Sequence, residues 1–221
     1  MLKNISNKTV IALTLWLTAL IASSYIPLAS LSGSFRYILS GINFVLPVAG
    51  GLFGLGMVCS LVSSLWLFKT IFLAKALTFG IPSACAMLSW AANTQKNSAA
   101  TVFSFLINAL LPAICMTIFM LYPASSAAWP YALYWLIPIA IWVMGYSSNL
   151  LLALQSTFIA HAVGSVMWVF LVPMTASQWI MLIPVVAVER FGIALLAAGL
   201  HRAILATTAM LTTKYVQKHR A

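Results

Sequence analysis

The chain has 221 residues, of which 63% are hydrophobic and only 5% are charged, and its formal net charge is +10 at pH 7. Soluble domains carry about 25% charged residues, so this composition excludes a soluble protein and indicates an integral membrane protein. The basic residues stand mostly at the ends of apolar segments, where they set membrane orientation rather than bind nucleic acid. We therefore expect a single membrane domain over residues 1–221, in contact with lipid.

Seven apolar blocks follow one another along the chain, separated by short polar or Pro/Gly-containing breaks. They cover residues 10–31, 38–67, 71–92, 102–122, 129–146, 150–173 and 178–211. Each block is long enough for a helix, and isolated strands cannot cross lipid because their backbone groups would lack partners. The pattern predicts an all-α, polytopic helical bundle. The first block lacks an Ala-x-Ala cleavage site, so we interpret it as a retained helix.

The number of spans depends on block 71–92, which contains Lys75 and a Gly80-Ile81-Pro82 break. Seven spans would place the two basic termini on opposite sides of the membrane. If block 71–92 instead enters and leaves on one side, six spans remain and nearly all loop cations are cytoplasmic, as the positive-inside rule requires. We predict six spans in the inner (cytoplasmic) membrane, with both termini cytoplasmic and 71–92 re-entrant; seven spans are the alternative.

Glu189 is the only acidic residue, and it stands next to Arg190 inside the last apolar block. A charge at the centre of a spanning helix costs roughly 2.5–3.5 kcal/mol on insertion scales, so such residues normally face a bundle interior or a ligand. On a helix, Arg190 shares a face with His201 and four alanines, and Glu189 points to the neighbouring face. The two side chains either satisfy each other or contact a ligand near mid-membrane.

The preceding block carries a second polar stripe, because Phe158, His161, Ser165 and Trp168 fall on one helical face. His161 lies at a depth comparable to that of Glu189. A membrane histidine can serve as a helix–helix hydrogen-bond donor, or it can bind substrate or relay protons.

Three further residues complete the predicted substrate-binding site. Asn43 and Asn108 are intramembrane amides that also suit hydrogen bonds between helices. Trp135 belongs to an aromatic group near the outer face that forms either an interfacial belt or a wall over a site. The full candidate set is Glu189, Arg190, His161, Ser165, Phe158, Trp168, Asn43, Asn108 and Trp135.

Several kinds of chemistry are excluded or disfavoured by the sequence. It contains no GxxxxGK[ST] phosphate-binding loop and no HExxH zinc motif, and one acid cannot form a paired-carboxylate or two-metal site. The cysteines Cys59, Cys85 and Cys115 stand in apolar segments without a CxxC pattern, so we interpret them as buried hydrophobic residues. We expect no enzyme activity, no metal and no cofactor. The Gly50-Gly51-Leu52-Phe53-Gly54 run predicts close helix packing.

Three regions of the sequence resemble the substrate-binding S components of energy-coupling-factor (ECF) transporters. They are Phe44-Val45-Leu46-Pro47 with the glycine run that follows, His161-Ala162-Val163-Gly164-Ser165, and Ile183-Pro184 leading to Glu189-Arg190. The last region is similar to the family's final helix, in which Glu189 takes the place of the acid. The family's first helix often carries Ala-xxx-Ala, and the nearest pattern here is Ala19-xxx-Ser23.

The resemblance implies a six-helix membrane subunit that binds a vitamin-like or other small nutrient near the outer face. It also implies partners, namely a transmembrane coupling subunit and separate ATPases that drive uptake. Two alternatives stay open on the sequence alone: a stand-alone small-molecule transporter or channel, and a structural subunit of a membrane complex.

Overall fold

A computed structural model of the protein describes residues 27–28, 39–40, 45–53, 80–94 and 98–218. These residues are helical apart from short connections and one two-residue antiparallel pairing of β1 (Pro27–Leu28) with β2 (Leu39–Ser40). The helices, besides a helical stretch at 45–53, are α4 (Ile81–Thr94), α5 (Ser98–Phe105), η3 (Leu106–Leu110), α6 (Leu111–Leu121), η4 (Ser126–Ala128), α7 (Trp129–Ala132), η5 (Leu133–Trp135), α8 (Leu136–Met144), α9 (Asn149–Leu171) and α10 (Ala176–Lys218).

Four helical runs in the described part of the chain are long and apolar enough to cross a membrane. They are Ser98–Leu121, Ser126–Met144, Asn149–Leu171 and Ala176–Thr213. These runs match the last four apolar blocks of the sequence, so the prediction of membrane helices is confirmed there. Most of block 10–31, about two thirds of block 38–67 and the first part of block 71–92 lie outside the described residues.

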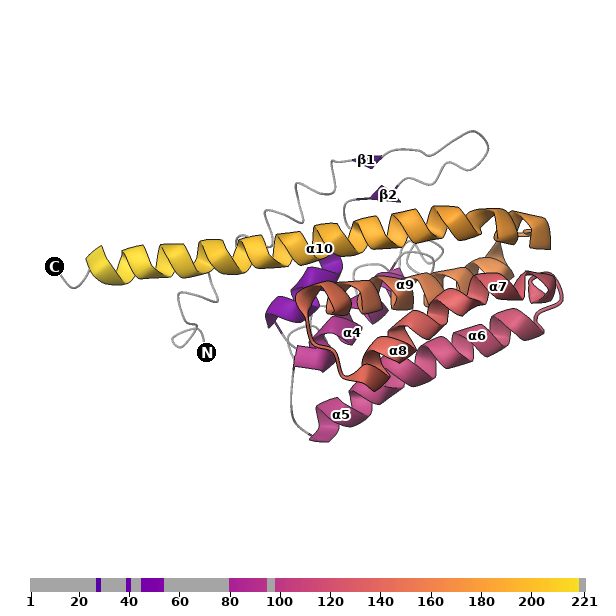
Figure 1. Ribbon diagram of the computed structural model, residues 1–221, viewed down its shortest axis with the longest axis horizontal. Helices are drawn as coiled ribbons and strands as arrows, with labels where there is room; N and C mark the ends of the chain where they lie inside the picture. The colour runs from indigo at the N-terminus through magenta and orange to yellow at the C-terminus, as the bar shows by residue number, and fades with distance from the viewer. Residues whose placement is uncertain (1–26, 29–38, 41–44, 54–79, 95–97, 219–221) are drawn as a thin grey trace, which may run out of the picture.

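The four runs alternate in direction along the bundle (Figure 1). The connection from α6 to η4 and the connection from α9 to α10 lie at one end, and the connection from α8 to α9 lies at the other. Contacts between η4 and α10 hold the first two connections together. Residues around 123–128 and 172–175 therefore share one side of the bundle, and residues 145–148 are on the opposite side.

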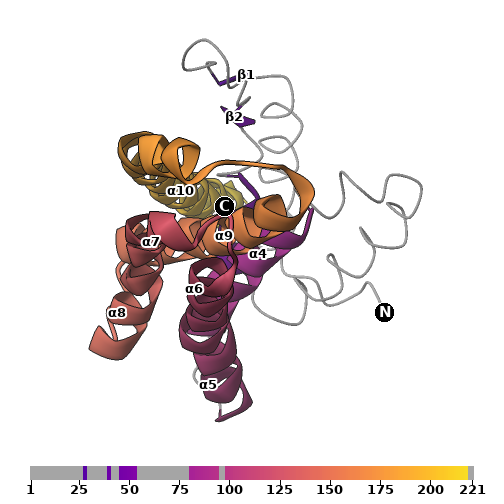
Figure 2. The ribbon, with the colours of Figure 1, turned by 90° about the vertical axis from the view of Figure 1, so that its right-hand side faces the viewer.

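Helix α9 lies at the centre of the bundle, with α4, α10, α6 and α8 packed around it (Figure 2). Its sequence, NLLLALQSTFIAHAVGSVMWVFL, is apolar on nearly every side and buries thirteen of its residues. A helix that is hydrophobic all round is typically buried, which explains its central position. The polar residues that it does carry are therefore held inside the protein.

Local signals in the sequence fix where α9 begins. Gly145 ends α8 in the left-handed conformation, with φ of 66°, which a residue without a Cβ adopts at little cost. Ser148 then caps α9 by accepting a hydrogen bond of 3.4 Å from the Leu151 amide through its side chain. The sharp reversal brings α9 back through the middle of the helices that precede it.

The helical stretch 45–53, which contains Gly50 and Gly51, packs against α4. The sequence predicts such close packing for the run from Gly50 to Gly54. A Cβ atom added to Gly50 would overlap the backbone carbonyl of Met87, and one added to Gly51 would lie 2.5 Å from Nε1 of Trp90. The absence of both side chains therefore lets the two backbones approach closely. Gly54, the last glycine of the predicted pattern, lies outside the described residues.

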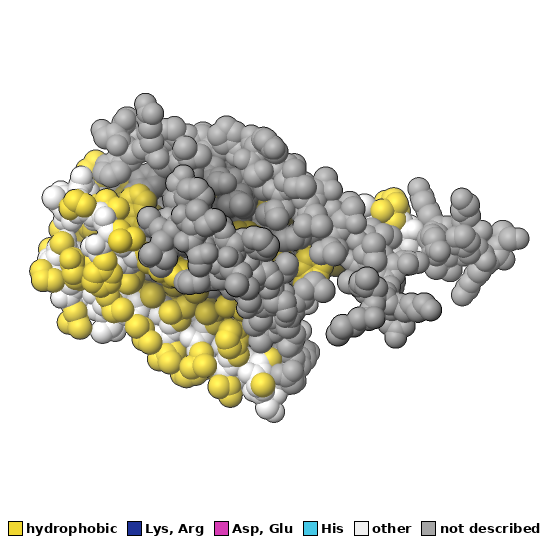
Figure 3. Space-filling view, turned by 180° about the vertical axis from the view of Figure 1, so that it is seen from behind, with side chains coloured by type: hydrophobic (Ala, Val, Ile, Leu, Met, Phe, Trp, Pro, Cys, Tyr) yellow, Lys and Arg dark blue, Asp and Glu magenta, His cyan; other side chains and the backbone are white. Residues whose placement is uncertain are grey.

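The outer surface of the bundle is apolar. Large hydrophobic side chains are exposed along the spanning runs, among them Leu121, Val143, Met181 and Val188. Figure 3 shows such side chains gathered over the described surface of one face. An apolar exterior around a core that contains hydrogen-bonded polar groups is the arrangement expected of a protein surrounded by lipid.

Candidate functional site

The first candidate region is an aromatic cluster around His161, formed at the end of the bundle where α6 connects to η4. We define the aromatic cluster as Phe119 of α6, Tyr131 of α7, Tyr134 and Trp135 of η5, Phe158 and His161 of α9, and Trp179 of α10. Five helical elements thus contribute rings to one place. Burial of so many large rings gives this end of the bundle its main apolar core.

His161 lies among three rings of the cluster. Its ring centroid is 5.2 Å from that of Tyr131, 6.3 Å from that of Phe158 and 6.4 Å from that of Trp135. The interplanar angles are 59°, 81° and 65°, so the imidazole meets its neighbours at steep angles rather than in parallel stacks. The sequence-predicted residues Phe158, His161 and Trp135 are therefore brought together in space.

The cluster contains polar atoms that the fold leaves unused. Nε2 of His161 and Nε1 of Trp135 are buried and have no hydrogen-bond partner among the residues that the structure describes. Trp135 is fully buried, and His161 is only 6% exposed. A buried polar atom without a partner costs about 1–3 kcal/mol, so two of them in adjacent rings are an uncommon arrangement.

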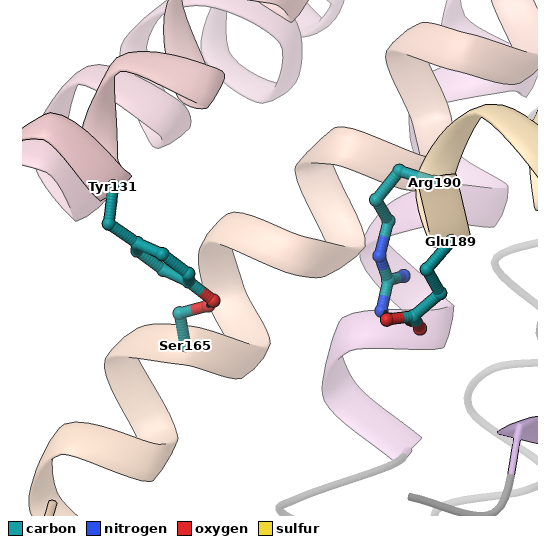
Figure 4. A network of polar contacts seen from close by, with 4 residues as sticks. All are labelled: Tyr131, Ser165, Glu189 and Arg190. Atoms are coloured by element: carbon teal, nitrogen blue, oxygen red, sulfur yellow. Dashed lines mark hydrogen bonds and ion pairs between the residues drawn. The ribbon is translucent and has the colours of Figure 1, made fainter. Parts of the chain in front are cut away.

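Two tyrosine hydroxyls fasten the short helices α7 and η5 to the longer ones. The hydroxyl groups of Tyr131 and Ser165 lie 3.1 Å apart and share a hydrogen bond (Figure 4). Tyr134 donates a hydrogen bond of 2.7 Å to the backbone carbonyl of Ile183 on α10, and its ring stacks on Phe158 at 5.6 Å. Ser165, a predicted site residue, therefore lies beside the cluster as the partner of Tyr131.

Glu189 and Arg190 bind each other. Nη2 of Arg190 donates a hydrogen bond of 2.7 Å to Oε1 of Glu189, and the two side chains are only 16% and 15% exposed (Figure 4). Of the two roles expected for these side chains, the structure shows the direct ion pair, and contact with a ligand stays a prediction. The guanidinium still has a free donor, because its buried Nε atom has no partner in the described part of the chain.

The ion pair is close to the aromatic cluster. Phe191, the residue after Arg190, approaches Phe158 with a centroid distance of 6.1 Å. Arg190 also lies within electrostatic range of the His161 ring. Helix α10 therefore brings the residue that follows the ion pair against the Phe158 ring at one edge of the aromatic cluster.

Asn108 is brought into a different polar cluster, nearer the other end of α9. It accepts a hydrogen bond of 2.6 Å from the Ser89 hydroxyl and donates one of 3.1 Å to Ser104. Ser104 in turn donates to Asn93 at 3.0 Å, and Asn93 donates to Gln155 at 2.8 Å. This buried network joins α4, α5, η3 and α9, and Asn108 contributes to it rather than to the cluster at His161.

Each polar side chain of this network has a hydrogen-bond partner, so the network can act as a structural connection between helices. Gln155 donates a hydrogen bond of 2.9 Å to the Pro138 carbonyl, and the Trp142 indole donates to Ser104 at 3.2 Å. Asn108 itself lies in the π-helical turn η3, just before Pro112 in the second position of α6. Our alternative interpretation of Asn108, a hydrogen bond between helices, therefore describes its observed role.

The remaining predicted site residues are Trp168, which packs against the hydrophobic core that contains the aromatic cluster, and Asn43. Trp168 is half-buried near the end of α9, one turn beyond Ser165. Asn43 lies outside the described residues. The stripe predicted on α10 is confirmed for Ala194, Ala197 and His201, which are buried.

Several residues of these clusters carry no signal in the sequence. Phe119 is one of many apolar residues in its block, yet it meets Tyr131, Trp135 and Trp179 at 5.4, 5.3 and 5.1 Å. Ser89, Asn93 and Ser104 are small polar residues in apolar helices, and only Ser104, four positions before Asn108 on the same helical run, shares a face with a predicted residue.

A second histidine–tryptophan pair lies between helix 45–53, α4 and α10. The rings of Trp90 and His201 are 5.2 Å apart, and His201 also hydrogen-bonds the backbone of Gly51. Nε1 of Trp90 and Nδ1 of His201 lack partners in the described regions. Among the residues that the structure describes, no ion pair and no further ring contact is found at this pair, so the cluster at His161 is the stronger candidate.

Comparison with protein-family models, with curated proteins and with solved structures found no match to this chain. The function is therefore argued from the arrangement of its own residues. That arrangement offers apolar rings, a neutralised ion pair and unused hydrogen-bonding atoms inside a lipid-facing bundle, which suits the binding of a small molecule.

Proposed function

We propose that this protein is a membrane-embedded binding subunit for the uptake of a small, vitamin-like nutrient, which it binds at the aromatic cluster. The observation that carries the proposal is the pair of buried, unused atoms, Nε2 of His161 and Nε1 of Trp135, in adjacent rings. Ligand sites are typically lined by aromatic and apolar side chains with a few converging polar groups, and this cluster has that composition.

Free energy gives the reason for expecting a ligand. A bound molecule that hydrogen-bonds His161 and Trp135 would offset the cost of leaving those atoms unpaired in an apolar interior. Residues 126–135 are built from three short helical pieces, η4, α7 and η5, which cover His161 with Tyr131 and Trp135. A ligand could reach His161 only if this segment moved aside, and the hydrogen bonds of Tyr131 to Ser165 and of Tyr134 to the Ile183 carbonyl hold it in place.

The finer parts of the proposal follow from the sequence. We assign six spans with both termini cytoplasmic in the inner membrane, which places residues 123–128 and 172–175 outside. The chain lacks a phosphate-binding loop, so energy for uptake would come from separate ATPases through a coupling subunit, as in ECF transporters. The aromatic cluster then opens towards the outside, where a nutrient arrives.

The direct test is ligand detection on the whole protein. The full chain is purified in lipid nanodiscs from cells grown in rich medium, and native mass spectrometry measures any small molecule retained. We expect a stoichiometric bound species that is lost in His161→Phe, which keeps a ring but removes the nitrogens. Trp129→Phe is the matched control, because Trp129 is 52% exposed and outside the cluster.

Two outcomes would contradict the proposal. One is a protein that carries no small molecule before or after exposure to a metabolite extract. The other is equal retention by the wild type and by His161→Phe, provided that both melt at similar temperatures, since the ligand would then bind elsewhere.

A further inference from the structure

We infer that the ligand of the aromatic cluster is an uncharged planar molecule that offers hydrogen-bond acceptors, such as an aromatic amide or a heterocyclic carbonyl compound. The inference rests on the proposed function and specifies the chemistry of its ligand. Three features of the site support it: the kind of unused atoms, the charge balance and the orientation of the rings.

The unused atoms favour acceptors on the ligand. An indole Nε1 and a guanidinium Nε carry hydrogen and can only donate, so Trp135 and Arg190 both need acceptors. His161 Nε2 can donate or accept, depending on its tautomer. A ligand with acceptor oxygen or nitrogen atoms can therefore satisfy the adjacent Trp135 and His161, whereas a ligand that has only donors would leave the Trp135 indole unpaired.

The charge balance favours a neutral ligand. Arg190 is already neutralised by Glu189 at 2.7 Å, and no other Lys, Arg, Asp or Glu occurs between Ser98 and Val188. The next basic residue along α10 is Arg202, which is exposed and twelve positions on, or about 18 Å along the helix. Among the described residues, an anionic or cationic ligand would find no unpaired counter-charge at this apolar site and would lose its hydration there.

The rings favour a flat ligand. Tyr131, Trp135 and Phe158 surround His161 at interplanar angles of 59° to 81°, so both ring faces and ring edges are presented around the imidazole. Aromatic ligands pack well in such surroundings, because offset and edge-to-face contacts are the favoured geometries. The short helices that carry Tyr131 and Trp135 have to shift outwards to admit the ring.

The experiment uses three probes of nearly identical shape. Benzamide is neutral and offers a carbonyl acceptor, benzoate is an anion, and benzamidine is a cation that has only donors at pH 7. Binding of each to the full chain in nanodiscs is measured by saturation-transfer NMR. We expect benzamide to bind at least about tenfold more tightly than either charged probe, and Trp135→Phe to weaken it, whereas Trp129→Phe has no effect.

The outcomes separate this inference from the proposed function. Tighter binding of benzoate or benzamidine would overturn the inference and leave the proposed function standing. Native mass spectrometry can find a retained molecule even when none of the three probes binds. A charged or donor-only compound then overturns the inference. A neutral planar compound with acceptors supports it. If neither the probes nor any cellular molecule binds, both proposals fail.

Discussion

Arg190 donates a hydrogen bond of 2.7 Å to the carboxylate of Glu189, the residue directly before it on α10. Adjacent residues on a helix do not face each other, so both side chains have to bend together to form this contact. They do so because Glu189 is the only acid in the chain, and an unpaired charge inside an apolar bundle is costly. The apolar surroundings of the two side chains, rather than their spacing on the helix, therefore account for the ion pair.

Breaking the Glu189–Arg190 pair from one side should destabilise the protein more than removing both charges. Glu189→Gln leaves a largely buried guanidinium without a counter-charge, and we expect a loss of about 3 kcal/mol, the low end for a broken buried pair. The double variant Glu189→Gln/Arg190→Gln should recover much of this loss. Thermal unfolding in detergent measures both. Losses that simply add in the double variant would show that the two residues do not interact.

Helix packing at the glycine run gives a second prediction. Gly50→Ala should cost about 1–3 kcal/mol, because the added methyl group overlaps the Met87 carbonyl and forces α4 away. Gly199→Ala is the matched control, since nothing lies within 4 Å of the added atom and alanine favours the helix. Equal melting temperatures for the two variants would contradict the close approach.

In the second half of the chain, which the structure describes, the long helices could be predicted from the sequence. The last four apolar blocks became the four candidate spans, since length and hydropathy are local properties of the chain. The faces of α9 and α10 were also predictable, because Phe158, His161 and Ser165 recur at helical spacing and are buried together.

The residues that contact those faces of α9 and α10 were not predictable from the sequence, because they depend on which helices pack side by side. Asn108 and His161 were assigned to one site, but Asn108 bonds Ser89 and Ser104 in a separate network. Phe119 was not predicted at all, since one phenylalanine in an apolar block looks like any other. The ion pair was one of two open interpretations and is present in the structure, whereas contact with a ligand stays a prediction.

The buried network gives a third prediction. Gln155→Leu keeps the size of the side chain but removes a hydrogen bond to the Pro138 carbonyl and one from Asn93. Because the partners then remain buried and unpaired, we expect a loss of about 1–3 kcal/mol in stability. Thr117→Ala is the control, because its exposed hydroxyl bonds only its own helix. A Gln155→Leu protein as stable as the control would contradict a structural role for the network.

Orientation in the membrane can be tested by cysteine labelling. Ser126 and Ser147 are both exposed; Ser126 begins η4, and Ser147 belongs to the connection from α8 to α9. These two elements lie at opposite ends of the bundle (Figure 1), so single cysteines there should react with a membrane-impermeant maleimide from opposite sides. We expect Ser126→Cys to be labelled in intact cells and Ser147→Cys only after permeabilisation, in a background in which Cys59, Cys85 and Cys115 are replaced by serine. A cysteine at Lys96 should behave like Ser147→Cys, and labelling at Lys96 from outside would refute six spans.

The last prediction concerns residues 126–135, the short helical segment that covers His161. Tyr134→Phe removes the hydroxyl that donates to the Ile183 carbonyl at 2.7 Å but retains the ring that stacks on Phe158. The loss of one hydrogen bond of about 1 kcal/mol should raise the opening equilibrium of residues 126–135 roughly fivefold, because each 1.4 kcal/mol corresponds to tenfold. Hydrogen–deuterium exchange should therefore accelerate in this segment while α9 stays protected.

Tyr146→Phe is the control for this change, since Tyr146 is 54% exposed at the opposite end of the bundle. Local acceleration in Tyr134→Phe alone would mean that the segment opens independently of the core, as entry of a ligand to His161 requires. Acceleration that extends equally through α9 would instead mean that Tyr134 stabilises the whole bundle. In that case the short helices would be part of the core, and access to His161 would need a larger rearrangement.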